Sequence, residues 1–156
     1  MRFEDIYREY WQKVYRICMG YVNDHEWAKD ITQETFISIY QQLSNFKNQS
    51  SIGTWIYRIA VNHCLRQMER NSKFIKSSLP VEIVEEQKQD VEGKIAFLYK
   101  SIAELEEIDR IVISLELENV KQAEIALIVG LSEANVRVKI HRIKEKLTQK
   151  FNRYEQ

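Results

Sequence analysis

Six side chains between positions 134 and 142 have the types and the spacing needed to read the edges of DNA bases. Amide and guanidinium groups can form paired hydrogen bonds with bases, and cationic groups also contact phosphates. Four apolar residues recur among them at spacings of four, three and four, which predicts one buried stripe on a helix: Val136, Ile140, Ile143 and Leu147. The six candidate side chains then face away from the stripe: Ala134, Asn135, Arg137, Val138, His141 and Arg142.

The residues before this helix predict another helix and a tight turn. Apolar residues at helical spacing run through residues 122–129, and the small Ala126 would let the two helices pack closely. Gly130 can adopt the left-handed backbone that commonly ends a helix, and Ser132 can cap the next helix by accepting a backbone N–H. Residues 122–147 are therefore expected to form a helix-turn-helix, whose second helix would face the major groove of DNA.

Charge is unevenly distributed, although the whole chain has a formal net charge of zero. Residues 137–156, Lys139 among them, hold seven basic and two acidic side chains, whereas residues 104–124 hold seven acidic and two basic ones. The basic segment suits DNA phosphates, and the acidic segment would repel them. A solvated basic helix with no role on DNA is the alternative. The coincidence of this charge with Gly130, Ser132 and the apolar stripe favours DNA binding.

Composition favours an all-α protein. The 156 residues include one proline and four glycines, which suits helices better than a sheet-rich fold. No apolar run approaches the roughly 18 residues of a membrane span, and the N-terminus lacks a signal pattern. We therefore expect a cytoplasmic protein without membrane insertion.

The cysteines and histidines give little support to metal binding or catalysis. Cys18 and Cys64 are isolated in the sequence, and we expect both to be packing residues. The three histidines lie beside no obvious nucleophile or carboxylate pair. The sequence therefore predicts neither an enzyme nor a metal or cofactor site.

The only proline, Pro80, lies in a polar and acidic segment that predicts a domain boundary. Residues 76–93 hold two basic and five acidic side chains, and we interpret them as an exposed, flexible linker. The linker would join a first small helical domain at residues 1–75 to a second at residues 94–156, where four helices enclose the core. Because each domain is small, its core should be only marginally stabilising without contacts to a partner.

The first domain is rich in aromatic residues. Most of those on the broad face of its first helix are expected in the core: Phe3, Tyr7, Tyr10, Trp11, Tyr15 and Tyr21. Asp24 can cap a second helix. The buried side of that helix is expected to contain Ala28, Ile31, Thr35, Phe36, Ile39, Tyr40 and Leu43.

The other side of this second helix carries an acidic and amide-bearing stripe. Its members follow one another at helical spacing: Asp30, Gln33, Glu34, Ile37 and Gln41. The stripe could be an ordinary solvated face. A lone exposed isoleucine within it, however, is what a docking site for a protein partner would offer.

A polar loop at residues 45–55 is flanked by aromatic rings, and Gly53 would permit a sharp turn near its end. Its polar side chains and rings include Phe46, Asn48, Gln49, Ser50 and Trp55. Stacking on exposed rings close to arginines is how proteins hold single-stranded nucleic acid. Both rings could instead be core anchors, and for Trp55 we favour that interpretation.

A third helix is expected from Thr54 to about Asn71. Its core side would hold Ile56, Ile59 and Ala60, whereas the opposite sector carries Arg58, Asn62, Arg66 and Arg70 at steps of four. These polar side chains could hold a nucleic-acid backbone.

Three segments together resemble one protein family. They are residues 24–36 (DHEWAKDITQETF), residues 54–62 (TWIYRIAVN) and residues 124–136 (EIALIVGLSEANV). In this order they closely resemble the extracytoplasmic-function group of bacterial sigma factors, and the likeness covers nearly the whole chain. The resemblance implies that the first domain is sigma region 2 and the second is sigma region 4. It also implies a non-catalytic protein that directs core RNA polymerase to promoters and helps to melt the DNA.

The resemblance further implies roles for the residues identified above. Asp30, Gln33 and Glu34, with Ile37, match the segment that docks on the β′ clamp helices of polymerase, and the second domain would meet the β flap. The loop and the third helix match the parts that engage the minus-10 element: Phe46, Asn48, Gln49, Ser50, Trp55, Arg58, Asn62, Arg66 and Arg70. Residues of the last helix match the reader of the minus-35 element: Ser132, Ala134, Asn135, Arg137, Val138, Lys139, His141 and Arg142. An anti-sigma factor is a further candidate partner.

Two other functions compete with this one. A helix-turn-helix regulator would bind duplex DNA as a dimer without polymerase, on a palindromic site, but it leaves the first domain unexplained. A pure protein-interaction module, whose basic helix meets an acidic partner, has no use for the aromatic loop at residues 46–55.

Overall fold

The computed structural model describes residues 2–75 and 91–155, and these residues form helices joined by short connections. The first part contains α1 (Phe3–Val22), α2 (His25–Gln42), the short 3-10 helix η1 (Leu43–Asn45) and α3 (Ile52–Ile75). The second contains α4 (Val91–Ala103), α5 (Glu107–Leu117), α6 (Gln122–Val129) and α7 (Glu133–Tyr154). No strand occurs in either described range, which confirms the all-α prediction.

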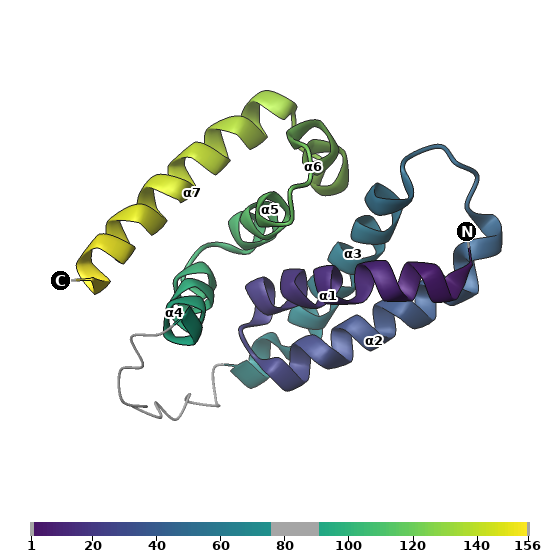
Figure 1. Ribbon diagram of the computed structural model, residues 1–156, viewed down its shortest axis with the longest axis horizontal. Coiled ribbons are helices and arrows are strands. Elements are labelled where there is room, and N and C mark those ends of the chain that lie inside the picture. The colour runs from purple at the N-terminus through teal and green to yellow at the C-terminus, as the bar shows by residue number, and fades with distance from the viewer. Residues whose placement is uncertain (1, 76–90, 156) are drawn as a thin grey trace.

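A sharp turn places α1 and α2 side by side (Figure 1). Asn23 adopts a left-handed backbone with φ of 49° and donates its N–H to the Met19 carbonyl, which ends α1. The carboxylate of Asp24 then accepts the backbone N–H of Trp27 at 2.8 Å and begins α2, as predicted. Asparagine tolerates this backbone because its short side chain can hydrogen-bond locally. The turn therefore follows from two adjacent residues.

The buried face of α1 is mainly aliphatic, and four of the predicted aromatic core residues, Phe3, Tyr10, Trp11 and Tyr15, are partly buried and pack against it. Ile6, Val14 and Ile17 are buried, but among the six aromatic residues only Tyr21 is. Tyr7 is 47% exposed, and on α2 Tyr40, also predicted to be buried, is 68% exposed. The branched aliphatic chains fill the space between the helices, and the larger rings lie at its edge.

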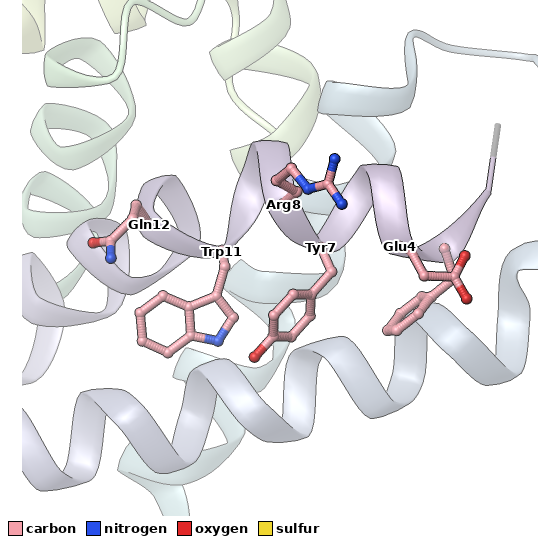
Figure 2. A pocket seen from close by; sticks show the side chains of 6 residues that line it. Glu4, Tyr7, Arg8, Trp11 and Gln12 are labelled. Carbon is pink, nitrogen blue, oxygen red and sulfur yellow. The ribbon is translucent and has the colours of Figure 1, made fainter.

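The rings at this edge pack on one another as well as against the core. Trp11 and Tyr15 stack with centroids 5.4 Å apart, and Tyr7 meets Phe36 edge-on at 5.1 Å. Figure 2 shows Tyr7 and Trp11 on one side of α1 and Arg8 on the other, around an open pocket. Aromatic pairs of this kind are stabilising without full burial.

The other predicted core positions are mostly confirmed. Ala28, Ile31, Thr35, Phe36 and Ile39 of α2 are buried, whereas Leu43 is only partly so. Both cysteines are buried, as expected of packing residues. They are isolated in sequence but not in space, because the two Sγ atoms lie 3.8 Å apart between α1 and α3.

The second part of the chain forms the predicted four-helix arrangement. Ile102, Ile113, Ile143 and Leu147 form a buried cluster shared by α4, α5 and α7. Ile95 of α4 lies outside this cluster and is 47% exposed. α4 starts at Val91, so residues 91–93 of the predicted linker are helical.

The two parts of the chain pack against each other. One hydrophobic cluster runs without a break from α1–α3 into α5, α6 and α7, and α5 lies between α1 and α7 (Figure 1). Arg16 of α1 forms two hydrogen bonds with the Glu118 carboxylate, of 2.5 and 2.9 Å. Arg110 of α5 donates to the Tyr21 carbonyl at 3.1 Å. Each small part thus obtains from the other the extra burial that its size requires.

The predicted domain boundaries stay a prediction, because most of the linker, including Pro80, falls at positions 76–90, outside the described residues. Within the described ranges, no helix is long and apolar enough to cross a membrane. The same ranges hold no group of three or more histidine, cysteine, aspartate or glutamate residues placed to bind a metal ion.

Candidate nucleic-acid interface

The helix-turn-helix has the predicted geometry. α6 ends at Gly130, whose φ is 75° and whose N–H reaches the Ala126 carbonyl. Ser132 then caps α7 by accepting the backbone N–H of Asn135 at 3.1 Å. This fixes the start of α7 and the direction in which its first turns project. The cap uses only the backbone N–H of Asn135, so the side-chain amide of this residue takes no part in the cap.

The apolar stripe of α7 is buried, and the opposite face is open. Val136, Ile140, Ile143 and Leu147 are all buried against α4–α6. Exposed side chains occupy the first half of the opposite face, as predicted: Ala134, Asn135, Arg137, Val138, His141 and Arg142. The face thus combines one amide, two guanidinium groups and a small apolar contact, which is the mixture that base edges and phosphates require.

Lys139, also predicted to contact DNA, is held within the fold and is not free on this face. Its side chain is only 24% exposed, and its ammonium group binds the Asp109 carboxylate of α5 at 3.1 Å. Lys144 likewise faces Glu116 at 3.5 Å, and Lys150 pairs with Glu104. The acidic segment therefore neutralises part of the basic helix within the fold. Since the partners are 28 to 46 positions apart in the sequence, helical periodicity could not reveal them.

The loop before α3 is held at both of its ends. Phe46 and Trp55 contact each other with ring centroids 5.0 Å apart, and both are partly buried. Ser51 accepts the backbone N–H of Thr54 at 3.1 Å and so caps α3. Between these anchors Asn48 and Gln49 are exposed and Ser50 is partly exposed. The two rings therefore brace a short polar segment that projects from the domain.

The turn in this loop is made by a different residue from the one predicted. Gly53 lies within the first turn of α3, which begins at Ile52, two residues before the expected start at Thr54. The left-handed backbone occurs instead at Asn48, with φ of 57°. Gly53 serves packing, because a Cβ atom there would lie 3.2 Å from the Tyr10 hydroxyl oxygen.

α3 separates a core side from a polar side as predicted. Ile56, Ile59 and Ala60 are buried, whereas the side chains of Arg58, Asn62 and Arg66 are exposed along the opposite sector. Arg70 lies outside the residues whose side chains the structure describes. Sequence reasoning missed one neighbour of this region. Ser51 donates to the Glu124 carboxylate of α6 at 3.4 Å, so the second part of the chain lies against the end of the loop.

The acidic and amide stripe of α2 is exposed as predicted. Asp30, Gln33, Glu34 and Ile37 all face solvent, and Ile37 is 58% exposed. The carboxylate of Glu34 also accepts a 2.9 Å hydrogen bond from Gln67 of α3. An exposed apolar side chain beside fixed polar groups is a suitable contact for another protein.

His63 lies beside this stripe, and its surroundings disfavour the charged form of its ring. Its Nδ1 atom is 3.9 Å from the Glu34 carboxylate, and its Nε2 atom is 2.8 Å from the Ser38 hydroxyl. Burial lowers the pKa of His63 below its ordinary value, and Arg66 lowers it further, although Glu34 acts in the opposite direction. This shift favours the uncharged ring at neutral pH, which weakens the charge interaction of His63 with Glu34.

Two protein-family models match the chain, one over its first part and one over its second. The model for sigma-70 region 2 matches residues 6–74, and the model for sigma-70 region 4 matches residues 98–147. The first match contains the α2 stripe, the loop and α3. The second contains the helix-turn-helix.

Relatives of known type extend over nearly the full chain. The sequence is 28% identical over 153 residues to the RNA polymerase sigma factor YlaC of Bacillus subtilis, covering 92% of this chain and 88% of that protein. It is 26% identical to the extracytoplasmic-function RNA polymerase sigma factor SigM of the same species, covering 98% and 97%. In both cases the similarity includes both helical parts.

The fold is also that of two solved structures. One is the sigma factor RpoE of Bartonella quintana in complex with the anti-sigma factor NepR, with a TM-score of 0.74, 18% identity and 94% coverage of each chain. The other is CnrH in complex with the cytosolic domain of CnrY, with a TM-score of 0.72, 19% identity and coverage of 96% and 87%.

Proposed function

The chain belongs to the extracytoplasmic-function group of the sigma-70 family and acts as an RNA polymerase sigma factor, and from this premise we propose how its surfaces divide that work. Core polymerase and promoter DNA are its partners. One observation carries the proposal: a single chain presents an acidic and amide stripe with an exposed isoleucine, a braced polar loop, and a helix with exposed amide and guanidinium groups, each on a separate element.

The stripe on α2 is the proposed docking surface for core polymerase. Asp30, Gln33 and Glu34 would contact the β′ clamp helices through charge and hydrogen bonds, and Ile37 would add apolar contact. Exposure of all four side chains in the free chain supports this assignment. The second domain would contact the β flap.

The loop that begins at Phe46, together with Trp55 and the polar sector of α3 (Ile52–Ile75), is the proposed minus-10 surface. Asn48, Gln49 and Ser50 can read an unpaired base, while the Phe46–Trp55 pair holds the loop in place. Arg58, Asn62, Arg66 and Arg70 would hold the backbone of the displaced strand. An extruded base costs a few kcal/mol to unstack, which a fitted pocket can offset.

The exposed face of α7 is the proposed minus-35 surface. Asn135 lies in the first turn, where base edges are closest, and an amide there can bind adenine with two hydrogen bonds. Arg137 and Arg142 would contact guanine or phosphates, and Ser132 fixes the start of the helix. Lys139 is left out of this surface because Asp109 holds it.

The proposed function is that of an initiation factor and not of an enzyme, in the cytoplasm where core polymerase is found. The two solved structures named above contain anti-sigma factors, and an anti-sigma factor is accordingly a proposed partner of this chain too. A helix-turn-helix regulator that acts without polymerase is not favoured, because the region 2 match accounts for the part of the chain that such a regulator would not need.

Charge reversal on α2 tests the docking surface. Asp30→Lys with Glu34→Lys should weaken binding to bacterial core polymerase by more than about tenfold, because like charges across an interface cost several kcal/mol. The matched control is Glu4→Lys with Asp5→Lys, which makes the same change of net charge on the exposed first turn of α1. Equal affinities for the two folded variants, measured by fluorescence anisotropy of labelled protein, would remove the stripe from the interface.

A further inference from the structure

We propose that Gln67 is a positioning residue, which holds the Glu34 carboxylate in place for the cation or hydrogen-bond donor that it meets on polymerase. This inference rests on the proposed docking surface of α2. Gln67 itself lies on α3 and is only partly exposed, and it would act through Glu34 without contacting polymerase.

A short chain of hydrogen bonds carries the inference. The Nε2 group of Gln67 donates to the Glu34 carboxylate at 2.9 Å. The indole Nε1 group of Trp27 in turn donates to Oε1 of Gln67 at 3.4 Å. Trp27 lies in the first turn of α2 and Glu34 near its middle, and Gln67 of α3 connects the two.

The chemistry of the two outer groups fixes the orientation of the central amide. An indole N–H can only donate, and an ionised carboxylate can only accept. The amide therefore has to present its oxygen to Trp27 and its nitrogen to Glu34. A flipped amide would place N–H against N–H at one end and oxygen against oxygen at the other. Trp27 thus fixes the orientation of the Gln67 amide, and the amide fixes the orientation of the Glu34 carboxylate.

The position of Glu34 makes this arrangement useful for binding. Its side chain is 50% exposed, so the carboxylate can reach a partner while one oxygen stays bonded to Gln67. A free glutamate would lose rotamer freedom on binding, and an oriented one loses less, which improves affinity without adding a contact. The uncharged ring of His63, 3.9 Å away, leaves the negative charge of Glu34 available to that partner.

A double-mutant cycle on polymerase affinity tests the proposal. Gln67→Met keeps the length of the side chain and removes its hydrogen bonds. We expect it to weaken binding to core polymerase roughly two- to fivefold, the order of the cost of immobilising one flexible side chain at an interface. In a Glu34→Ala background the same substitution should have no effect, because no carboxylate is left to orient. A merely structural role of Gln67 would weaken binding equally in both backgrounds.

Trp27→Phe provides a second variant that keeps the ring and removes the indole N–H. It should weaken polymerase binding less than Gln67→Met does, and again only when Glu34 is present. Urea unfolding of each variant checks that the fold is retained.

The possible results separate this inference from the docking surface itself. If Glu34→Ala weakens binding and the effect of Gln67→Met simply adds to it, the positioning role is wrong and the docking surface stands. Tighter binding by Gln67→Met would mean that Gln67 competes with polymerase for the carboxylate, which also overturns the role. If Glu34→Ala leaves affinity unchanged, both the docking role of Glu34 and the positioning role of Gln67 fail.

Discussion

A close approach of α1 and α5 gives a prediction that can be worked out from the structure. Gly20 of α1 lies against Ser114 of α5, and a Cβ atom added at Gly20 would lie 2.0 Å from the Ser114 Oγ atom and 3.1 Å from its Cβ atom. Neither distance is compatible with normal packing. Gly20→Ala should therefore destabilise the protein by pushing α1 and α5 apart.

The magnitude follows from two opposed effects. The hydroxyl of Ser114 can rotate away, because it has no hydrogen-bond partner among the described residues. The 3.1 Å approach to its Cβ atom remains, so the backbones must separate slightly, and overpacking of a core typically costs about 1 to 3 kcal/mol. Alanine in a helix interior recovers about 0.5 to 1 kcal/mol relative to glycine. Taking the midpoints of the two ranges, about 2 and about 0.75 kcal/mol, the expected net loss in the free energy of unfolding is a little over about 1 kcal/mol.

Urea unfolding followed by circular dichroism measures this loss, and Ser114→Gly provides the matched background. That substitution removes both atoms that the new Cβ would meet, so Gly20→Ala in this background should be neutral or stabilising. The helix propensity gain is the same in both backgrounds and cancels in the cycle. A Gly20→Ala protein that is as stable as the wild type in the Ser114 background would show that α1 and α5 do not approach this closely in solution, and would refute the packed arrangement of the two parts.

Further predictions concern DNA binding and pH. Asn135→Ala should change which minus-35 sequences are preferred. Arg142→Ala should instead lower affinity about equally on all of them and reduce the slope of log affinity against log salt by about 1. Equal losses of affinity on every sequence for both variants, measured in a binding titration, would contradict the division between base reading and phosphate contact. Alanine at all three positions 48–50 should leave core polymerase binding intact and reduce strand opening, measured by permanganate reactivity of unpaired thymines, and normal opening would make the loop a simple connector. The free energy of unfolding should fall as pH decreases from about 6.5, the ordinary pKa of histidine. The pKa of His63 is lowered in the folded protein, so protonation favours the unfolded chain. A His63→Gln protein that loses as much stability as the wild type between pH 7.5 and pH 5.5 would exclude His63 as the cause.

The parts of the fold that local chemistry decides could be predicted from the sequence. Gly130 and Ser132 specify the turn of the helix-turn-helix through a left-handed backbone and a side-chain cap, and both were found as expected. Asp24 likewise caps α2. Helical periodicity identified the buried stripe of α7 and therefore the exposed face opposite to it. Each of these inferences uses residues within a few positions of one another.

The parts that depend on tertiary contacts could not be predicted. Lys139 lies at a position suited to DNA by spacing and charge, but Asp109 of another helix holds it. Gly53 was expected to form a turn, and it is a helical residue that makes room for Tyr10. Tyr40 fits the apolar pattern of α2 but lies at the edge of the interface with α1, where it packs edge-on against Phe3 and stays 68% exposed. Sequence spacing gives the direction of a side chain, and it does not say where a neighbouring helix ends.

Transcription from a library of randomised promoters by core RNA polymerase, with and without the purified protein, tests the central claim most directly. A sigma factor should make initiation sequence-specific, and the recovered templates should share two separate elements upstream of the start site, one matched to the minus-10 surface and one to the minus-35 surface. The protein should act as one copy per polymerase. Templates that are recovered without dependence on the protein, or a palindromic site that the protein selects as a dimer in the absence of polymerase, would contradict the account.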